Sequence, residues 1–263
     1  MSVICLFLFC VHQYFSTFSW FWCSKNTKQE VELEDGSSIK DLADKLNLRG
    51  PNESLVAEME GELKDLSTPL KEGDTVSLLH FDDPKGKEVF WHTSAHVLAQ
   101  AILRLFPEAK LTIGPPIENG FYYDFANLVI SDEQFGEIEK EVQKVLSENY
   151  KPERMTFSSK QEALDRFKDN KYKAELIQEI EGDLTGYTQG EFFDLCRGPH
   201  LPNLGKIKAF KLLKTSGAYW RGDAKNEMLT RIYAISFPDR KQLKEYLYIL
   251  EERSEEHTSE LQS

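Results

Sequence analysis

Two short stretches, far apart in the chain, each place two metal-binding or proton-binding side chains four positions apart. The first carries His92 and His96, and the second carries Cys196 and His200. Residues at i and i+4 of a helix project from the same side, so the first pair can present both imidazoles to one small volume. A glycine and a proline between Cys196 and His200 make the second stretch a turn. If the fold brings the two stretches together, three imidazoles and one thiol converge.

This set of side chains predicts a site with chemistry. Three imidazoles and a thiol suit a soft metal, or a pocket that activates water for hydrolysis. A zinc protease of the H-E-x-x-H type is not favoured, because Thr93 stands where that motif has its general base. The ordinary alternative is two satisfied histidines on a half-buried helix and a small core cysteine. We favour the functional interpretation, because the set uses three of the six histidines and the only cysteine beyond position 23.

Four blocks of the sequence resemble the editing domain of bacterial-type threonyl-tRNA synthetases. Their order, spacing and residues match within residues 31–252; the blocks are His92 to His96, Gly114 to Asp124, Asp194 to His200, and Ser216 to Asp223. Editing domains of alanyl-tRNA synthetases are similar only in the H-x-x-x-H and C-x-x-x-H pairs. The resemblance implies hydrolysis of the ester of mischarged seryl-tRNA(Thr), within a parent protein that ligates threonine to tRNA using ATP.

The resemblance also implies roles for individual residues. The substrate-binding residues it implies are Asp194, which would pair with the substrate ammonium group, Tyr123, which would wall the pocket, and Arg221. The catalytic residues it implies are His92, His96, Lys173, Cys196 and His200. Without the resemblance, Lys173 would be interpreted as a solvated lysine on a helix. Cys196 could be a nucleophile, a metal ligand or a wall that excludes larger substrates, and we favour the wall.

Cofactors and partners are expected from the same resemblance. Editing is expected to need no metal; if zinc binds, its ligands would be His92, His96, Cys196 and His200, all near 2.0–2.3 Å from the ion. ATP and a further zinc are expected only in a catalytic domain outside this sequence. The expected partner is the acceptor end of tRNA(Thr) carrying mischarged serine, and the parent protein is expected to be a homodimer through domains outside this sequence.

Two other functions remain open at this point. The chain could be a module that binds tRNA or a regulator without chemistry, or a freestanding trans-editing deacylase of the alanyl type. The intact set of three histidines and one cysteine favours an enzyme over a binding module. A C-terminal helix that continues toward a catalytic domain argues against a freestanding deacylase.

Composition limits how the chain can bind RNA. It has 263 residues, 40% of them hydrophobic, and its 32 basic and 44 acidic residues give a net charge of −12. Such a balance excludes binding nucleic acid through the whole surface, so any positive surface must be local. One candidate is a run of cations with a single acid, Asp223, among them: Lys206, Lys208, Lys211, Lys214, Arg221 and Lys225. Cys196 is the only cysteine outside the first 23 residues, so no disulfide framework is expected, which favours a reducing, cytoplasmic compartment. No membrane partner is expected.

The pattern of helices and strands predicts an α+β fold in two domains. Residues 28–83 resemble the TGS module, a ubiquitin-like β-grasp, chiefly through the run Gly61 to Leu70, and its first strand is expected to be missing. Ser38 is expected to cap a short helix there. Residues 82–87 form an expected linker, and residues 84–238 the α+β editing domain, in which Ser131 with Gln134 forms a predicted capping box. Residues 239–252 are a predicted helix toward a catalytic domain.

The two ends of the chain differ in composition from the rest. Residues 1–27 form a hydrophobic leader, uncharged up to position 24, which we interpret first as foreign sequence, second as a hydrophobic anchor and third as a signal peptide. Residues 253–263 resemble a translated sequencing adapter. We expect both ends to lie outside the fold and to pack poorly.

Overall fold

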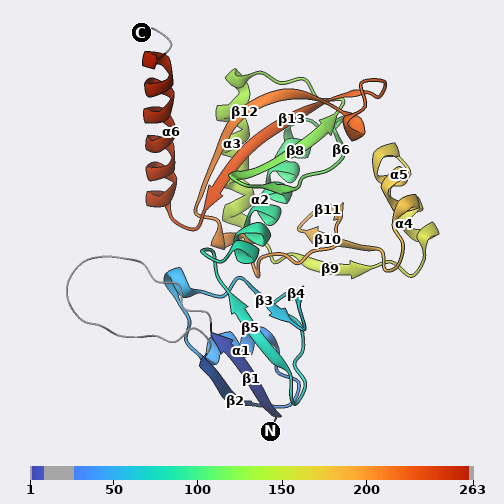
Figure 1. Cartoon of the computed structure of the whole chain (residues 1–263). Helices are drawn as coiled ribbons and strands as arrows, with labels where there is room; N and C mark the ends of the chain where they lie inside the picture. Colours follow the sequence, from blue (N-terminus) through green and yellow to red (C-terminus); the bar gives the residue numbers. More distant parts are fainter. Residues whose placement is uncertain (1, 9–26, 261–263) are drawn as a thin grey trace. The chain divides into compact units, whose positions relative to one another are not determined.

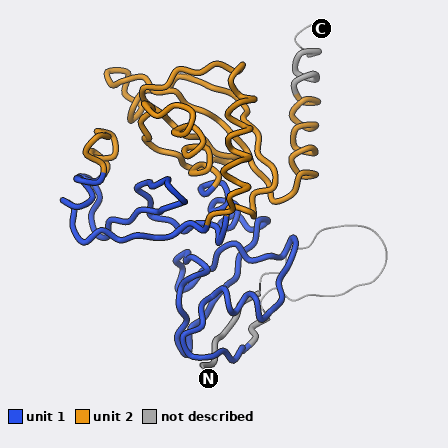
Figure 2. The backbone as a smooth tube through the Cα atoms, turned by 180° about the vertical axis from the view of Figure 1, so that it is seen from behind, with its two compact units in different colours: residues 1–93, 151–166, 177–203 blue, residues 94–150, 167–176, 204–263 orange. Residues whose placement is uncertain are grey.

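The computed structural model describes residues 2–8 and 27–260, and its secondary structure is mixed α and β (Figure 1). The described chain divides into two compact units, each assembled from separate stretches (Figure 2). The first unit contains residues 1–93, 151–166 and 177–203, and the second contains residues 94–150, 167–176 and 204–263. The predicted α+β class is therefore confirmed.

The first unit begins with a five-stranded sheet in the order β2-β1-β5-β3-β4. Its strands are β1 (Ser2–Leu8), β2 (Thr27–Leu33), β3 (Val56–Met59), β4 (Glu62–Lys64) and β5 (Thr75–Leu79). β1 runs antiparallel to β2 and parallel to β5, which is the central pairing of a β-grasp sheet. A single 3₁₀ turn, η1 (Gly50–Asn52), precedes β3.

Strand β1 differs from the expectation that the sheet lacks its first strand. Residues 2–8 supply that strand and pair with β2 along their whole length. The segment reads Ser-Val-Ile-Cys-Leu-Phe-Leu, rich in the β-branched and aromatic residues that favour strands. Its position between two strands satisfies backbone donors and acceptors on both sides. The remainder of the predicted leader, residues 9–26, lies outside the described residues.

Helix α1 (Ile39–Lys45) covers this sheet. Ser38 caps it as predicted: its side chain accepts the Asp41 backbone N–H, and the Asp41 carboxylate accepts the Ser38 N–H at 2.7 Å. Ile39 and Leu42 on its inner side are fully buried. They belong to one core with the apolar residues of the strands, Val31, Leu33, Ala43, Ala57, Leu66, Leu70, Val76 and Leu78.

The first unit also contains a three-stranded antiparallel sheet in the order β11-β10-β9. Its strands are β9 (Glu153–Thr156), β10 (Thr185–Gln189) and β11 (Phe192–Leu195). Helix α4 (Lys160–Arg166) follows β9, and the Ser159 hydroxyl accepts the Glu162 N–H at its start. The chain leaves β11 directly into the turn that contains Cys196 and His200.

Helix α2 (Pro84–Leu105) begins inside residues 82–87, which were expected to be a linker. Proline suits the first helical turn, because the N–H that it lacks has no intrahelical acceptor there. The Lys87 N–H donates to the Asp83 carbonyl, and the Asp83 carboxylate accepts the His80 N–H at 2.9 Å. These bonds allow residues 84–87 to be helical rather than turn.

The second unit is built around a sheet in the order β12-β13-β8-β6, with β7 also paired to β8. Helix α3 packs against β12, and the Ser131–Gln134 capping box precedes it as predicted. The elements of this part of the chain are β6 (Lys110–Leu111), β7 (Pro116–Ile117), β8 (Gly120–Ala126), η2 (Asp132–Gln134), α3 (Phe135–Glu148), α5 (Lys171–Glu179), η3 (Leu204–Lys206), β12 (Ala209–Tyr219), η4 (Trp220–Gly222), β13 (Met228–Phe237) and α6 (Arg240–Glu260).

An ion pair between a half-buried arginine and a buried aspartate joins two strands of this sheet. Arg231 on β13 donates two hydrogen bonds to the Asp124 carboxylate on β8, at 2.7 and 2.8 Å. The guanidinium also lies 3.8 Å from the ring centroid of Tyr122. The bidentate geometry suits a buried carboxylate, whose desolvation would be costly without a partner.

The C-terminal helix agrees with the predicted helix in its first part. α6 starts at Arg240, one residue after the predicted start, and its bounds extend past residue 253 to Glu260. Among the described residues, no helix combines the length and the apolar character needed to span a bilayer.

Candidate functional site

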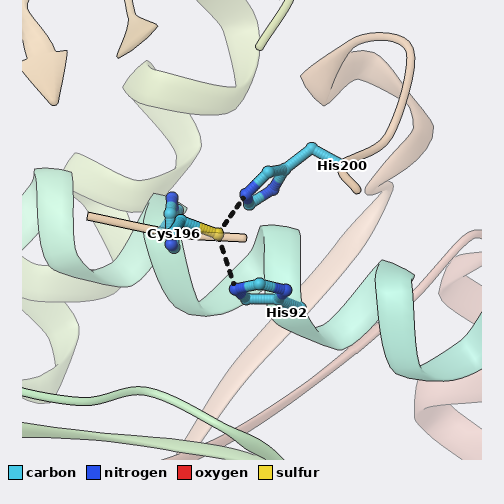
Figure 3. Close-up of side chains that lie close together, drawn as sticks. His92, Cys196 and His200 are labelled. Carbon is cyan, nitrogen blue, oxygen red and sulfur yellow. Dashed lines mark hydrogen bonds between the residues drawn. The ribbon is translucent and has the colours of Figure 1, made fainter. Parts of the chain in front are cut away.

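The two stretches singled out in the sequence meet in the structure. His92 projects from α2, and Cys196 and His200 come from the turn that follows β11 (Figure 3). The Cys196 backbone is fixed to β10, since its N–H donates to the Thr185 carbonyl and its carbonyl accepts the Thr185 hydroxyl, at 3.0 and 2.6 Å. Two secondary-structure elements therefore set the positions of these side chains.

Cys196 lies at the centre of the cluster. Its Sγ is 3.2 Å from Nε2 of His92 and 3.2 Å from Nε2 of His200, as Figure 3 shows. The Gly198 N–H also donates to Sγ at 3.2 Å. The two imidazole rings are 4.7 Å apart between centroids. The thiol is buried, so its hydrogen-bonding groups are these neighbours rather than bulk water.

Thr93, the neighbour of His92, orients His200. Its hydroxyl donates to the Val89 carbonyl at 2.9 Å and accepts the Leu201 N–H at 3.0 Å. The same oxygen is 3.1 Å from Nδ1 of His200. Because a hydroxyl has one proton, already used toward Val89, Nδ1 must be the donor. This network assigns the proton of neutral His200 to Nδ1 and leaves the lone pair of Nε2 directed at Cys196.

The electrostatics of the cluster keep His200 neutral. Burial lowers the pKa of His200 well below its ordinary value, because a buried imidazolium loses its hydration, and the nearby His92 lowers it further. His92 is half-buried, whereas His96, Cys196 and His200 are buried. His92 is thus the most accessible of these four side chains.

All four predicted cluster residues have the donor atoms of a metal site. The ligand atoms of His92, His96, Cys196 and His200 lie within 4.8 Å of one another. Tetrahedral zinc holds imidazole nitrogen at about 2.0–2.1 Å and thiolate sulfur at about 2.3 Å, so its ligands lie roughly 3.5 Å apart. The 3.2 Å separations between Cys196 and two imidazoles are close to that spacing. The donor set and its compactness therefore fit zinc, and they equally fit a hydrogen-bonded cluster.

The other predicted site residues lie on four elements. Asp194 is buried on β11, and its Oδ1 accepts the Leu195 N–H at 2.8 Å. Lys173 is buried on α5, and its N–H donates to Asn170. Tyr123 on β8 is 1% exposed and stacks on Phe125, as a core residue does. The roles predicted for these residues stay predictions.

Arg221 occupies an unusual backbone position in the second unit. It lies in η4, between β12 and β13, with a φ of 56°. Its guanidinium is 5.4 Å from the Trp220 ring centroid and 3.6 Å from the Glu175 carboxylate. The side chain is more than a third exposed, so it can reach a ligand only by exchanging these contacts for new ones.

The predicted basic run is partly neutralised by neighbours. Lys211 pairs with Glu139 at 3.0 Å, and Lys214 lies 5.0 Å from the Tyr233 ring centroid. An anionic ligand would have to compete with Glu139 for the first of these cations. The run is therefore less positive in the fold than its sequence suggests.

Three residues of the site were not predicted. Thr93 could have been recognised, because it lies inside the first motif and a buried threonine beside a histidine is a natural orienting group. Tyr187 and Asp65 had no comparable signal, since each is far in sequence from the residue it contacts. The Tyr187 hydroxyl donates to Asp65, and the His200 N–H donates to the same carboxylate.

Family comparisons define the class of protein to which these features belong. Residues 27–80 match the TGS domain, and residues 184–233 match the "Threonyl and Alanyl tRNA synthetase second additional domain". The first match covers the β-grasp sheet from β2 to β5, and the second covers the turn that carries Cys196 and His200. A TGS domain and a second additional domain of synthetase type are therefore present in one chain.

Individual relatives give a more specific result. Over 227 residues the chain is 67% identical to "Threonine--tRNA ligase" of Protochlamydia amoebophila (strain UWE25), and this match covers 86% of the chain and 35% of the relative. Identity to the ligase of Chlamydia trachomatis serovar L2b is 53% over the same length, and to that of Caldanaerobacter subterraneus subsp. tengcongensis 47% over 226 residues. The chain spans 35% of the length of these relatives. The resemblance to the N-terminal region of threonine–tRNA ligases is confirmed.

Proposed function

We propose that the region after the TGS domain is an aminoacyl-tRNA deacylase that hydrolyses seryl-tRNA(Thr). The observation that carries the proposal is the packing of Cys196 between His92 and His200, at 3.2 Å from each. Cys196 and His200 lie within residues 184–233, which match a synthetase second additional domain. A compact group of imidazoles is suited to positioning and deprotonating a water molecule.

The need for such an activity follows from the chemistry of the two amino acids. Serine lacks one methyl group of threonine, and one methyl in a pocket is worth only about 1–3 kcal/mol of discrimination. A second site that hydrolyses the smaller product and excludes the larger one supplies the missing accuracy. A buried, well-packed wall is what steric exclusion of one methyl requires.

His92 is the proposed general base. The thiol proton of Cys196 is directed at the lone pair of His200 Nε2, so Sγ accepts hydrogen bonds from its other neighbours, among them Nε2–H of His92. Nδ1 is then the basic atom of His92, and this ring is the half-buried member of the cluster. His92 removes the proton of the attacking water, and the same nitrogen can return it to the leaving ribose hydroxyl.

The remaining residues bind and orient the substrate. Asp194 would hold the ammonium group of the seryl ester by charge complementarity, and Cys196 would wall the pocket against the extra methyl. His96 would contact the terminal ribose and help to fix the water, His200 would orient Cys196 through its Nε2 lone pair, and Lys173 would stabilise the developing oxyanion. Tyr123 would form part of the pocket wall from the core, and Arg221 would bind the substrate.

The reaction is proposed to proceed without a metal. If zinc binds, His92, His96, Cys196 and His200 would hold it, and it would lower the pKa of a bound water toward 7. A metal would occupy the lone pair of His92 Nε2 and would convert Cys196 to a thiolate. The hydrogen-bonded cluster described above needs neither change.

Properties of the longer relatives are proposed for a longer parent protein. We infer that it ligates threonine to tRNA(Thr) with ATP, acts in the cytoplasm, and dimerises through regions outside this chain. Residues 28–83 and 84–238 are the proposed extents of the two domains. Strand β1 at residues 2–8 completes the sheet of the first domain. Residues 239–252 are the proposed connection to a catalytic domain, and residues 253–263 are proposed to lie outside the domains.

Deacylation of two matched substrates tests the proposal. Purified chain is mixed with seryl-tRNA(Thr) or threonyl-tRNA(Thr), and the loss of the labelled amino acid from tRNA is followed by acid precipitation. We expect hydrolysis of the seryl ester and at most slow hydrolysis of the threonyl ester. Asp194→Ala should raise the KM for seryl-tRNA. Equal rates on both esters, or rates equal to spontaneous hydrolysis, would exclude an editing function.

A further inference from the structure

One residue of the TGS domain reaches the cluster. Asp65 follows β4, and its two carboxylate oxygens accept hydrogen bonds from residues more than a hundred positions away. Oδ1 accepts the backbone N–H of His200 at 2.9 Å, and Oδ2 accepts the Tyr187 hydroxyl at 2.6 Å. All three residues belong to the first unit.

Tyr187 connects this carboxylate to the turn. Its side chain is 2% exposed, and its ring lies 4.4 Å from the His200 ring between centroids. Burial raises the pKa of Tyr187 far above its ordinary value, and the charge of Asp65 raises it further, so the phenol stays protonated and donates. Without this acceptor the buried hydroxyl would have lost its hydrogen bonds to water without replacement, which would destabilise the folded state.

The Tyr187 hydroxyl also packs on Gly198. A Cβ atom at Gly198 would lie 2.1 Å from that oxygen, and the φ of Gly198 is 70°. Only glycine allows this close approach and this backbone conformation without strain. The turn is therefore fixed at three points: Cys196 through Thr185, Gly198 through Tyr187, and the His200 backbone through Asp65.

From these contacts we propose that Asp65 is a positioning residue for the cluster, so that the TGS domain forms part of the site instead of being only an appended module. Asp65 acts through the backbone of His200 and through Tyr187, and it touches no reacting atom. Its loss leaves the turn free to shift His200 and Cys196 relative to His92. Misplacement by about 1 Å is enough to cost a large factor in rate. The activity part of the test rests on the proposed deacylase function.

The test compares four variants in the full chain. Asp65→Ala removes both hydrogen bonds, Asp65→Asn keeps an oxygen for the His200 N–H, and Tyr187→Phe removes only the phenolic bond. Asp44→Asn is the matched control, since Asp44 is an exposed TGS carboxylate that forms an ion pair with Lys40. Two rates are measured: seryl-tRNA deacylation, separated into kcat and KM, and alkylation of Cys196 by iodoacetamide, followed on its own peptide by mass spectrometry. Tm identifies any variant that fails to fold.

We expect Asp65→Ala to lower kcat about tenfold with little change in KM, because the catalytic groups are misplaced and the substrate contacts remain. Asp65→Asn should recover most of that loss, and Asp44→Asn should behave as wild type. Alkylation of Cys196 should become roughly threefold faster or more in Asp65→Ala, since a loosened turn opens more often.

Folded Asp65→Ala and Tyr187→Phe proteins with wild-type kcat and wild-type alkylation rates would overturn the proposal. If Asp65→Ala does not fold, Asp65→Asn and Tyr187→Phe supply the same comparison. A wild-type chain without deacylase activity would overturn the proposed function alone, since the alkylation rates still test the positioning by Asp65.

Discussion

Oγ1 of Thr93 lies 3.1 Å from Nδ1 of His200, and that single hydroxyl serves three partners. It donates to the Val89 carbonyl and accepts the Leu201 N–H while it orients the imidazole. A residue that looks like the spacer of an H-x-x-x-H motif therefore decides which nitrogen of His200 faces Cys196.

Thr93→Val tests this orientation with little change in volume. The change leaves the Leu201 N–H and Nδ1–H of His200 without an acceptor, at a cost of about 1–3 kcal/mol in the free energy of unfolding. We also expect deacylation to slow by roughly tenfold, because His200 loses its fixed ring orientation. Chemical denaturation and single-turnover deacylation measure the two effects. Thr93→Ser, which keeps the hydroxyl, should restore both; failure of serine to restore activity would argue against the orienting role.

His92→Ala tests the general base. Loss of acid–base help should slow deacylation by roughly 10²–10⁴-fold. Because His92 is half-buried at the edge of the cluster, Tm should change little. His96→Ala is a useful comparison, since His96 lies one turn further along α2 and is buried, so it should lose stability as well as activity. Near-normal turnover in folded His92→Ala would assign the proton transfer to another group.

Removal of metal tests the chemistry of the cluster directly. After treatment with a chelator and removal of zinc, measured by elemental analysis, the chain should keep its deacylation rate. In the proposed mechanism the hydrogen bonds at Cys196 orient His92 and His200. If activity instead disappears and returns with added zinc, the four residues are ligands and the attacking water is metal-activated.

Stability should depend on pH through His200. The unfolded chain has an ordinary histidine pKa near 6.5, and the folded state has a lower one because of burial. Above about pH 6.5 both states are neutral at this residue. Below it the unfolded chain binds a proton that the native state does not, so the free energy of unfolding falls as pH falls, by at most about 1.4 kcal/mol per pH unit from this residue. The loss ends once the pH is below the folded pKa.

Urea unfolding at a series of pH values between 5 and 7.5 measures this dependence. His200→Gln removes the titrating group, so its stability should fall less steeply with acidification than that of the wild-type chain. Identical slopes in the two proteins would mean that folding does not shift the pKa of His200.

Much of the local structure could be predicted, because it depends on near neighbours. Ser38 and Ser131 cap their helices through residues three positions away, and both caps form. The cluster was also predictable, since paired spacing and a resemblance marked its members. Asp65 was not, because it is 135 residues from His200 and nothing in its local sequence indicates a distant backbone partner.

Two structural features, β1 and the start of α2, were not predicted from the sequence. In both, composition is a poorer guide than the backbone hydrogen bonds that the segment can form. Residues 2–8 were interpreted as part of a foreign leader, yet they complete the sheet as β1. Pro84 was interpreted as part of a linker, yet it starts α2. In both cases the partners of the backbone hydrogen bonds decide the structure. For β1 these partners are strands distant in sequence, and for α2 they include the hydrogen bonds around Asp83 at the start of the helix.

The separation of the site residues along the chain has a consequence for synthesis on the ribosome. His92 and Cys196 are 104 residues apart, and Asp65 is further still from His200. The sheet and helix around Asp65 need only the first eighty residues, so they can fold while the rest is still being made. At that stage Asp65 has neither Tyr187 nor His200 to bind. The turn that contains Cys196 and His200 has not yet been synthesised, so it cannot pack against α2. The nascent chain therefore carries no reactive centre until translation has passed His200, and the already folded N-terminal domain then serves as the template against which the turn closes.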